Sequence, residues 1–279
     1  QLVLERRRRS EAVEHDRHID QRIVGVGALP INQPEALAVV EDIVPMTVVV
    51  GRREPRRQAS VCGFDRGHAL LPGLLDAGQC EDLVALYDQD RLFRSRIVMA
   101  RHGFGRGEYK YFAYPLPPVL DALRHQLYQA LAPVADRWNQ QLGVATRHPP
   151  TLAAFLDCCH RAGQSRPTPL ILRYGAGDYN CLHQDLYGDH VFPLQVAILL
   201  SAPGEDFEGG EFVMTETDGA DQRAAVVPLR RGDAVVFAVN ERPVPGRRSG
   251  WRRVAMRHGV SRLRSGARHT VGLIFHDAR

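Results

Sequence analysis

The segment LILRYGAGDYNCLHQD spans residues 170–185 and ends in a His-Gln-Asp triplet. On a regular strand, His183 and Asp185 would leave the same face, because side chains two residues apart point the same way. His258 follows 73 residues after Asp185. Two imidazoles and one carboxylate are the ligand set that holds a non-haem Fe(II) ion and leaves its other positions open. We therefore predict that His183, Asp185 and His258 converge on one metal ion.

Arg268 lies ten residues beyond His258, within VAMRHGVSRLRSGARHTVGLIF (254–275). Its planar guanidinium is suited to binding a carboxylate through two hydrogen bonds. An iron ion with open positions beside such a cation predicts 2-oxoglutarate as co-substrate, together with O2. Thr270 would share a strand face with Arg268 and could add a hydrogen bond to the same carboxylate. A simple hairpin would put Arg268 and His258 on opposite faces, so this interpretation requires the chain to cross between two sheets.

Short strand-like segments with glycine-rich turns such as GAGD and RRGD dominate the chain after Pro169. The expected strands are 170–175, 179–186, 194–201, 211–216, 225–229, 234–239, 252–262 and 268–276. Many short strands with such turns favour a closed sandwich or jelly roll. The predicted fold class is mainly β with N-terminal helices, namely a double-stranded β-helix (jelly roll, cupin-like) supported by about three helices.

The expected helices are 76–89, 116–143 and 151–163. The first has an aspartate at its start as N-cap, and the third ends at Gly163. Pro133 should bend or break the long second helix, because proline cannot donate a backbone hydrogen bond. These helices are expected to cover an outer face of the barrel.

Residues 101–114, RHGFGRGEYKYFAY, mix glycine, arginine and aromatic residues. They fit a flexible lid or substrate clamp, in which the arginines and aromatics would neutralise and stack on an unpaired nucleotide. They fit equally well a structural loop whose aromatics pack on the barrel.

Five cysteines stand at positions 62, 80, 158, 159 and 181, with no CxxC spacing. Neither a disulfide framework nor a zinc site is therefore indicated. Cys181, two residues before His183, would share its metal-facing side on a regular strand. We interpret it as a packing residue.

The order of these motifs resembles the Fe(II)/2-oxoglutarate-dependent dioxygenase superfamily over roughly residues 62–277. The pattern RY-x-x-G-x-x-Y-x-x-H-x-D, then GGE, then GD-x-x-x-F is similar to the prolyl-hydroxylase branch, which also has a basic residue ten positions after the distal histidine. That residue is often lysine in the collagen-type enzymes and is Arg268 here. RY-x-x-G with LHQD also resembles the AlkB-type enzymes that demethylate damaged nucleic acid, although those place their 2-oxoglutarate arginine further beyond the histidine. The closest overall likeness is to a bacterial oxygenase family labelled as acting on alkylated DNA.

The resemblance implies that oxidative decarboxylation of 2-oxoglutarate is coupled to substrate hydroxylation, with Fe(II), 2-oxoglutarate and O2 as cofactors. It implies that Tyr174, nine residues before His183, contacts 2-oxoglutarate. It assigns no catalytic residue beyond the metal centre.

The substrate implied by the AlkB-like features is an N-alkylated base in single-stranded or damaged nucleic acid, which hydroxylation would demethylate. The alternative substrate is a prolyl or other side chain of a protein. A non-enzymatic cupin-like binding module is a third reading, but it leaves Arg268 and the ligand triad without a purpose.

The predicted domain organisation is an N-terminal extension over 1–60, expected to be mobile, and a dioxygenase domain over 61–279. Within that domain, 74–163 form the helical support and 168–277 the jelly-roll core. Basic clusters at 6–9 and 52–57 set the extension apart.

The composition of the chain, with 44% hydrophobic and 24% charged residues, is ordinary for a globular protein. No apolar run approaches the ~20 residues needed to cross a membrane. With no apolar core of a signal peptide, a cytoplasmic location is expected. The net charge of +4 suits a polyanionic partner. However, Lys110 is the only lysine, and such an arginine excess is equally typical of GC-rich coding.

Overall fold

The computed structural model describes residues 64, 66–186 and 188–279. The extension predicted over 1–60 lies outside these residues. Its boundary with the domain over 61–279 therefore stays a prediction.

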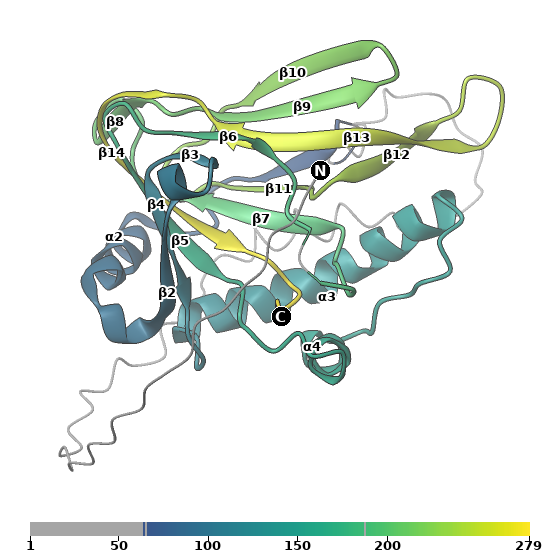
Figure 1. Cartoon of the computed structure of the whole chain (residues 1–279), viewed down its shortest axis with the longest axis horizontal. Coiled ribbons are helices and arrows are strands. Elements are labelled where there is room, and N and C mark those ends of the chain that lie inside the picture. Colours follow the sequence, from purple (N-terminus) through teal and green to yellow (C-terminus); the bar gives the residue numbers. More distant parts are fainter. Residues whose placement is uncertain (1–63, 65, 187) are drawn as a thin grey trace, which may run out of the picture. The chain divides into compact units, whose positions relative to one another are not determined.

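Two antiparallel β-sheets form the centre of the domain (Figure 1). The first sheet runs in the order β1 (His68–Leu71), β11 (Ala234–Ala238), β7 (Leu194–Leu199), β14 (Leu263–Leu273), β5 (Leu170–Gly175), β4 (Glu108–Phe112) and β2 (Phe93–Val98), with β8 (Phe207–Gly209) beside β14. The second runs in the order β10 (Asp221–Val227), β9 (Phe212–Asp218), β13 (Trp251–Val260), β6 (Tyr179–His183) and β3 (Gly105–Arg106), with β12 (Glu241–Pro245) beside β13.

The chain path from β5 to β14 is that of a jelly roll. Strands β5, β7, β11 and β14 lie in the first sheet, and β6, β9, β10 and β13 lie in the second. The last strand, β14, returns between β5 and β7. This alternation between two sheets is the double-stranded β-helix topology, so the predicted fold class is confirmed. The chain also crosses between the sheets from β13 to β14, as the placement of Arg268 required.

Burial explains which strands could be recognised from the sequence. Strands β7 and β11 are buried on both faces, so they read as short continuous apolar runs. Strand β13 alternates instead, and Val254, Met256 and His258 point inward while the residues between them are more exposed. Because His258 lies on the inward face of this alternating strand, its imidazole points into the space between the sheets.

Some predicted boundaries were wrong. Strand β6 ends at His183 rather than at 186, and β14 begins at Leu263 rather than at 268. The segment 101–114, expected as a lid or loop, contains the strands β3 and β4. Tyr109 and Tyr111 on β4 turn toward a cavity between the sheets, while Lys110 is buried on the opposite face.

The helices are α2 (Ala77–Ala85), α3 (Pro118–Gln141) and α4 (Leu152–Arg161), with short 3-10 turns η1 (Leu86–Asp88), η2 (Asp90–Leu92) and η3 (Met99–Arg101). Asp76 caps α2 as predicted, since its side chain accepts from the backbone N–H of Gln79. Of the predicted bend or break at Pro133, the break does not occur, because α3 continues through the proline. Leu131 and Val134, on either side of that proline, are both buried in the core, which holds the helix together.

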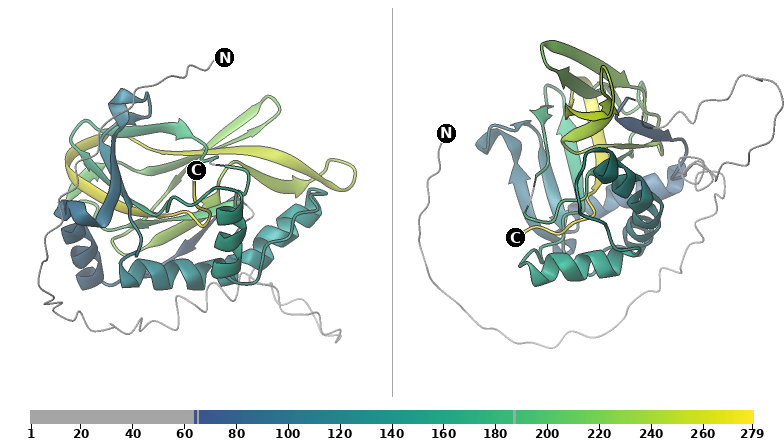
Figure 2. Two further views of the ribbon diagram at one scale, coloured as in Figure 1. Left: turned by 60° about the horizontal axis from the view of Figure 1, so that its bottom comes forward. Right: turned by 90° about the vertical axis from the view of Figure 1, so that its right-hand side faces the viewer.

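Helices α3 and α4 lie on the side of the first sheet, away from β9, β10 and β13 (Figures 1 and 2). This arrangement agrees with the prediction that helices cover an outer face of the barrel. Within the described part of the chain, no helix is long and apolar enough to cross a membrane.

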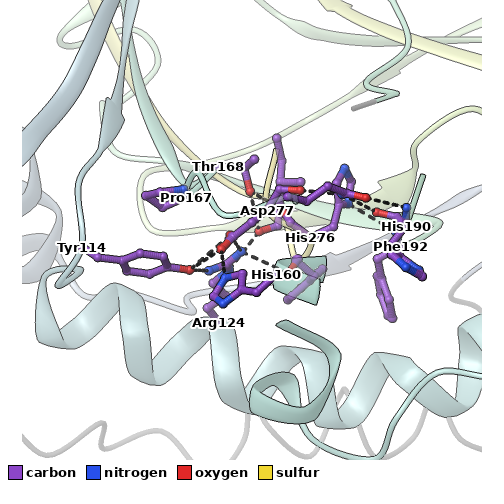
Figure 3. Close-up of polar contacts among 12 residues, drawn as sticks. Tyr114, Arg124, His160, Pro167, Thr168, His190, Phe192, His276 and Asp277 are labelled. Atoms are coloured by element: carbon purple, nitrogen blue, oxygen red, sulfur yellow. Dashed lines mark hydrogen bonds and ion pairs between the residues drawn. The ribbon is translucent and has the colours of Figure 1, made fainter. Parts of the chain in front are cut away.

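A buried ion pair ties the end of the chain to these helices (Figure 3). Arg124 of α3 lies 2.9 Å from a carboxylate oxygen of Asp277, and both side chains are almost fully buried. The hydroxyl of Tyr114 donates to the same carboxylate, and Nε2 of His160 lies 2.9 Å from it. Because Asp277 follows β14 closely, this network anchors the strand that carries Arg268.

Candidate metal centre and co-substrate pocket

The fold brings the three predicted metal ligands together. One donor atom from each of His183, Asp185 and His258 lies within 4.8 Å of the other two. His183 and His258 are paired across β6 and β13, and their ring centroids are 4.2 Å apart. Asp185 enters from just beyond the end of β6, so it reaches the cluster from the loop rather than from the strand.

Hydrogen bonding orients His183 toward this cluster. Nδ1 of His183 lies 2.8 Å from the backbone carbonyl of Cys181. A carbonyl only accepts, so Nδ1 carries the proton and Nε2 keeps its lone pair. The Nε2 atom of His183 lies 3.6 Å from Asp185 Oδ1, so its lone pair is on the part of the ring that faces the donor cluster.

The charge state of the cluster suits a divalent cation. Burial raises the pKa of Asp185, but its contacts with His258, His183 and Gln195 outweigh burial and leave the pKa well below its usual range. Burial lowers the pKa of His258. An ionised carboxylate and a histidine whose neutral form is favoured are the states that metal binding requires.

Arg268 lies in the same cavity as the three donors. Its side chain is almost fully buried, and Nη1 donates to Thr270 Oγ1 at 2.6 Å. Its Nε has no hydrogen-bond partner, and the guanidinium forms no ion pair with any carboxylate of the residues that the structure describes. Burial lowers its pKa to about 10, so it is still a cation at neutral pH. A buried cation without an anion indicates a place for an anionic ligand.

Thr270 lies beside Arg268 on β14, as predicted, and Tyr174 lies on its other side. Tyr174 is paired with Arg268 across β5 and β14, and its ring centroid is 5.7 Å from the guanidinium carbon. Both Tyr174 and Thr270 are buried and line the cavity. Burial raises the pKa of the Tyr174 hydroxyl, which therefore stays a neutral hydrogen-bonding group.

The cavity that joins the donors to Arg268 has a volume of about 270 Å³. Its walls are mainly apolar and aromatic, including Phe104, Tyr109, Tyr111, Phe212 and Phe237. A mainly apolar, aromatic-walled pocket with a few polar groups is typical of a small-molecule site.

The expectation for Cys181 was wrong. Its side chain is exposed and is not part of the cavity lining. Strand β6 is irregular at this point, because His183 pairs with His258 whereas Asn180 pairs with Val260. The extra residue in β6 breaks the alternation that would have put Cys181 and His183 on one face.

Alternative ligands and clamps lie elsewhere. By residue type, His190, His269 and His276 are alternative ligands in principle, but none of the three joins the donor cluster. Arg262 donates to the carbonyl of Gly177, and Arg264 is exposed beside Glu211, so neither takes the place of Arg268.

Sequence reasoning missed Gln195, a buried residue of β7 that lies in contact with the donor cluster. It also missed Tyr109 and Tyr111 as cavity residues. A signal for Gln195 was present, since it is the one amide in the otherwise apolar run LQVAILL.

Two proteins of Mycobacterium tuberculosis are similar to this chain in sequence. Uncharacterized protein Rv2227 of Mycobacterium tuberculosis (strain H37Rv) is 47% identical over 168 residues, which cover 60% of this chain and 72% of that protein. The same figures hold for Uncharacterized protein MT2286 of Mycobacterium tuberculosis (strain CDC 1551).

Two solved structures are similar at low identity. A Pseudomonas putida prolyl-4-hydroxylase is 16% identical with a TM-score of 0.48, over 88% of this chain and 99% of that one. An oxidoreductase of the 2OG-Fe(II) oxygenase family from Burkholderia pseudomallei is 15% identical with a TM-score of 0.47, over 90% and 95%.

The family model Oxygenase-NA, described as an oxygenase catalysing oxidative methylation of damaged DNA, matches residues 107–278. This match covers more than half of the chain and includes every predicted site residue. The prediction of an oxygenase, and hence of an oxidoreductase, is confirmed. The His-Asp-His donor set could hold a metal ion, in agreement with the predicted metal site, whereas the identity of that metal as Fe(II) and the use of 2-oxoglutarate stay predictions. The chain belongs to the Oxygenase-NA family.

Proposed function

We propose that this protein hydroxylates N-alkyl groups on DNA bases and thereby removes them, with Fe(II) held by His183, Asp185 and His258. The observation that carries the proposal is one cavity that contains this donor cluster and the unpaired guanidinium of Arg268. When bound, iron with 2-oxoglutarate and O2 supplies the oxidising chemistry.

In this proposal Arg268 holds the distal carboxylate of 2-oxoglutarate. The unpartnered Nε supports this role, because an ion pair with the co-substrate would satisfy it. Thr270 orients the guanidinium through the hydrogen bond from Nη1. Tyr174, whose buried side chain lies beside Arg268 and lines the cavity, contacts the bound 2-oxoglutarate.

The mouth of the cavity supports a nucleic-acid substrate. Phe104 and Leu186 line the cavity and are also exposed, so their apolar surface can pack on a base that enters. Arg101 and Arg106 are exposed in the neighbouring chain around β3 and can neutralise phosphates. A base inside a duplex would have to be flipped out to reach the cavity. Because DNA is the proposed substrate, a cytoplasmic location is part of the proposal.

A protein side chain is the second candidate substrate. The ten-residue spacing between His258 and Arg268, which resembles the prolyl-hydroxylase branch, favours it. A non-enzymatic binding module is excluded by membership of an oxygenase family.

Succinate production distinguishes the two substrates. The full chain is incubated with Fe(II), 2-oxoglutarate and either an N-methylated oligonucleotide, its unmethylated counterpart or a proline-bearing peptide. The proposal expects the methylated oligonucleotide to stimulate succinate release and to lose its methyl group. Stimulation by the peptide alone would move the substrate to the protein class.

Binding of single-stranded DNA is expected to weaken linearly with salt on a log–log plot, because phosphate contacts release counterions. Arg101→Ala or Arg106→Ala should each flatten the slope by roughly one unit. Arg223→Ala, an exposed arginine of β10 that does not line the cavity, is the matched control and should leave the slope unchanged. Fluorescence anisotropy at several salt concentrations measures the slope. A DNA affinity that does not change with salt concentration would contradict the proposal that these arginines bind phosphates.

A further inference from the structure

Gln195 is an unusual residue for its position. It lies in β7, where every residue is buried and the other five are leucine, valine, alanine and isoleucine. Its own side chain is buried and lines the cavity beside the donor cluster. Its Oε1 has no hydrogen-bond partner, so the amide carries an uncompensated desolvation cost. Packing alone would favour an apolar side chain here, which indicates that the amide has another role.

The amide nitrogen of Gln195 holds Asp185. Nε2 donates to Asp185 Oδ2 at 2.8 Å. An ionised carboxylate can only accept, so the nitrogen and not the oxygen of the amide must face it. Because Oδ2 is engaged by this bond, the rotation of the carboxylate within the donor cluster is restricted.

The same nitrogen also lies 3.2 Å from Nε2 of His258. His258 Nε2 also lies 3.4 Å from Asp185 Oδ2. Because the amide nitrogen only donates and is the nearer of the two, its second hydrogen favours the tautomer with a lone pair on His258 Nε2. His258 then carries its proton on Nδ1, which is buried and without a partner. This is the tautomer that turns an Nε2 lone pair toward the cluster, as the hydrogen bond to Cys181 does for His183.

We propose that Gln195 is a positioning residue that sets the Asp185 carboxylate and the His258 tautomer before the metal arrives. The inference rests on the proposed metal-binding role of these two residues. Outer-sphere hydrogen bonds of this kind orient metal ligands and contribute to metal affinity. The one amide group of Gln195 contacts two of the three ligands.

The test compares wild type with Gln195→Met, which keeps the side-chain length and removes both donors. Cobalt(II) titration of the metal-free full chain should show a loss of affinity of roughly tenfold. Correlation of imidazole 15N and 1H resonances in the metal-free protein should show His258 moving from the Nδ1–H form toward the Nε2–H form. Ile198→Val, on the opposite face of the same strand, is the control for a change of packing and should alter neither result.

Gln195→Asn is the second variant, for use if Gln195→Met does not fold. It retains the amide but withdraws it by one methylene, so cobalt affinity and the His258 tautomer should change in the same direction as predicted for Gln195→Met. Unchanged cobalt affinity and an unchanged His258 tautomer in a folded variant would overturn the inference. If wild type binds no cobalt, the metal-centre proposal fails, while the tautomer measurement still decides the role of Gln195.

Discussion

His183→Ala is expected to abolish 2-oxoglutarate turnover while leaving the fold intact. The substitution leaves one imidazole and one carboxylate to hold the metal. Fe(II) affinity should therefore fall by more than the ~100-fold that the loss of an outer-sphere partner can cost. The fold should survive, because the His183 side chain is 33% exposed at the end of β6. Its hydrogen bond to the backbone carbonyl of Cys181 joins residues only two apart in the chain, so its loss does not disconnect any elements.

Anaerobic Fe(II) titration and succinate release measure the two effects, and the thermal midpoint of the metal-free protein reports on the fold. His190→Ala is the matched control, because this histidine follows in the same part of the chain and does not belong to the donor cluster. Metal binding that survives in His183→Ala but is lost in His190→Ala would show that the ligand set is wrong.

Arg268→Ala is expected to raise the KM for 2-oxoglutarate by roughly ten- to a hundredfold, since a charge-assisted pair in a buried pocket is lost. With a pKa of about 10, the guanidinium is charged throughout the neutral range, so the size of the effect should not depend on pH between 6 and 8. Metal affinity in the absence of 2-oxoglutarate should remain, because Arg268 makes no hydrogen bond to the three donors.

Steady-state kinetics at saturating Fe(II) provides the measurement for Arg268. Arg264→Ala is the control, since Arg264 is exposed and lies beside Glu208 and Glu211. An unchanged KM in Arg268→Ala, with an increase in Arg264→Ala or Arg262→Ala, would place the carboxylate clamp elsewhere.

The core of the fold could be predicted because its strands carry strong local signals. β7 and β11 are buried on both faces and are almost wholly apolar, while β13 alternates up to His258. The site could be predicted from strand alternation as well. A simple hairpin would put His258 and Arg268 on opposite faces, so a shared site required the chain to change sheets between them, as it does from β13 to β14.

Other features depend on tertiary pairing and leave little trace in the sequence. The irregular register of β6 turns Cys181 outward, and nothing in the residues around it marks that irregularity. Strand β4 mixes charged and aromatic residues, and its identity as a strand comes from pairing with β2 and β5. The contacts of Gln195 join β7 to the other sheet, so they appear only once the two sheets face each other.

The central claim is that the donor cluster and Arg268 form one site for iron and 2-oxoglutarate. Anaerobic calorimetric titration of 2-oxoglutarate into the full chain, with and without Fe(II), tests it most directly. The account predicts tight binding with the metal and much weaker binding without it. His183→Ala should lose the gain in affinity that the metal provides, and Arg268→Ala should bind 2-oxoglutarate more weakly than wild type with the metal and without it. Equal affinity for 2-oxoglutarate in the presence and absence of Fe(II), unaffected by either substitution, would contradict the account.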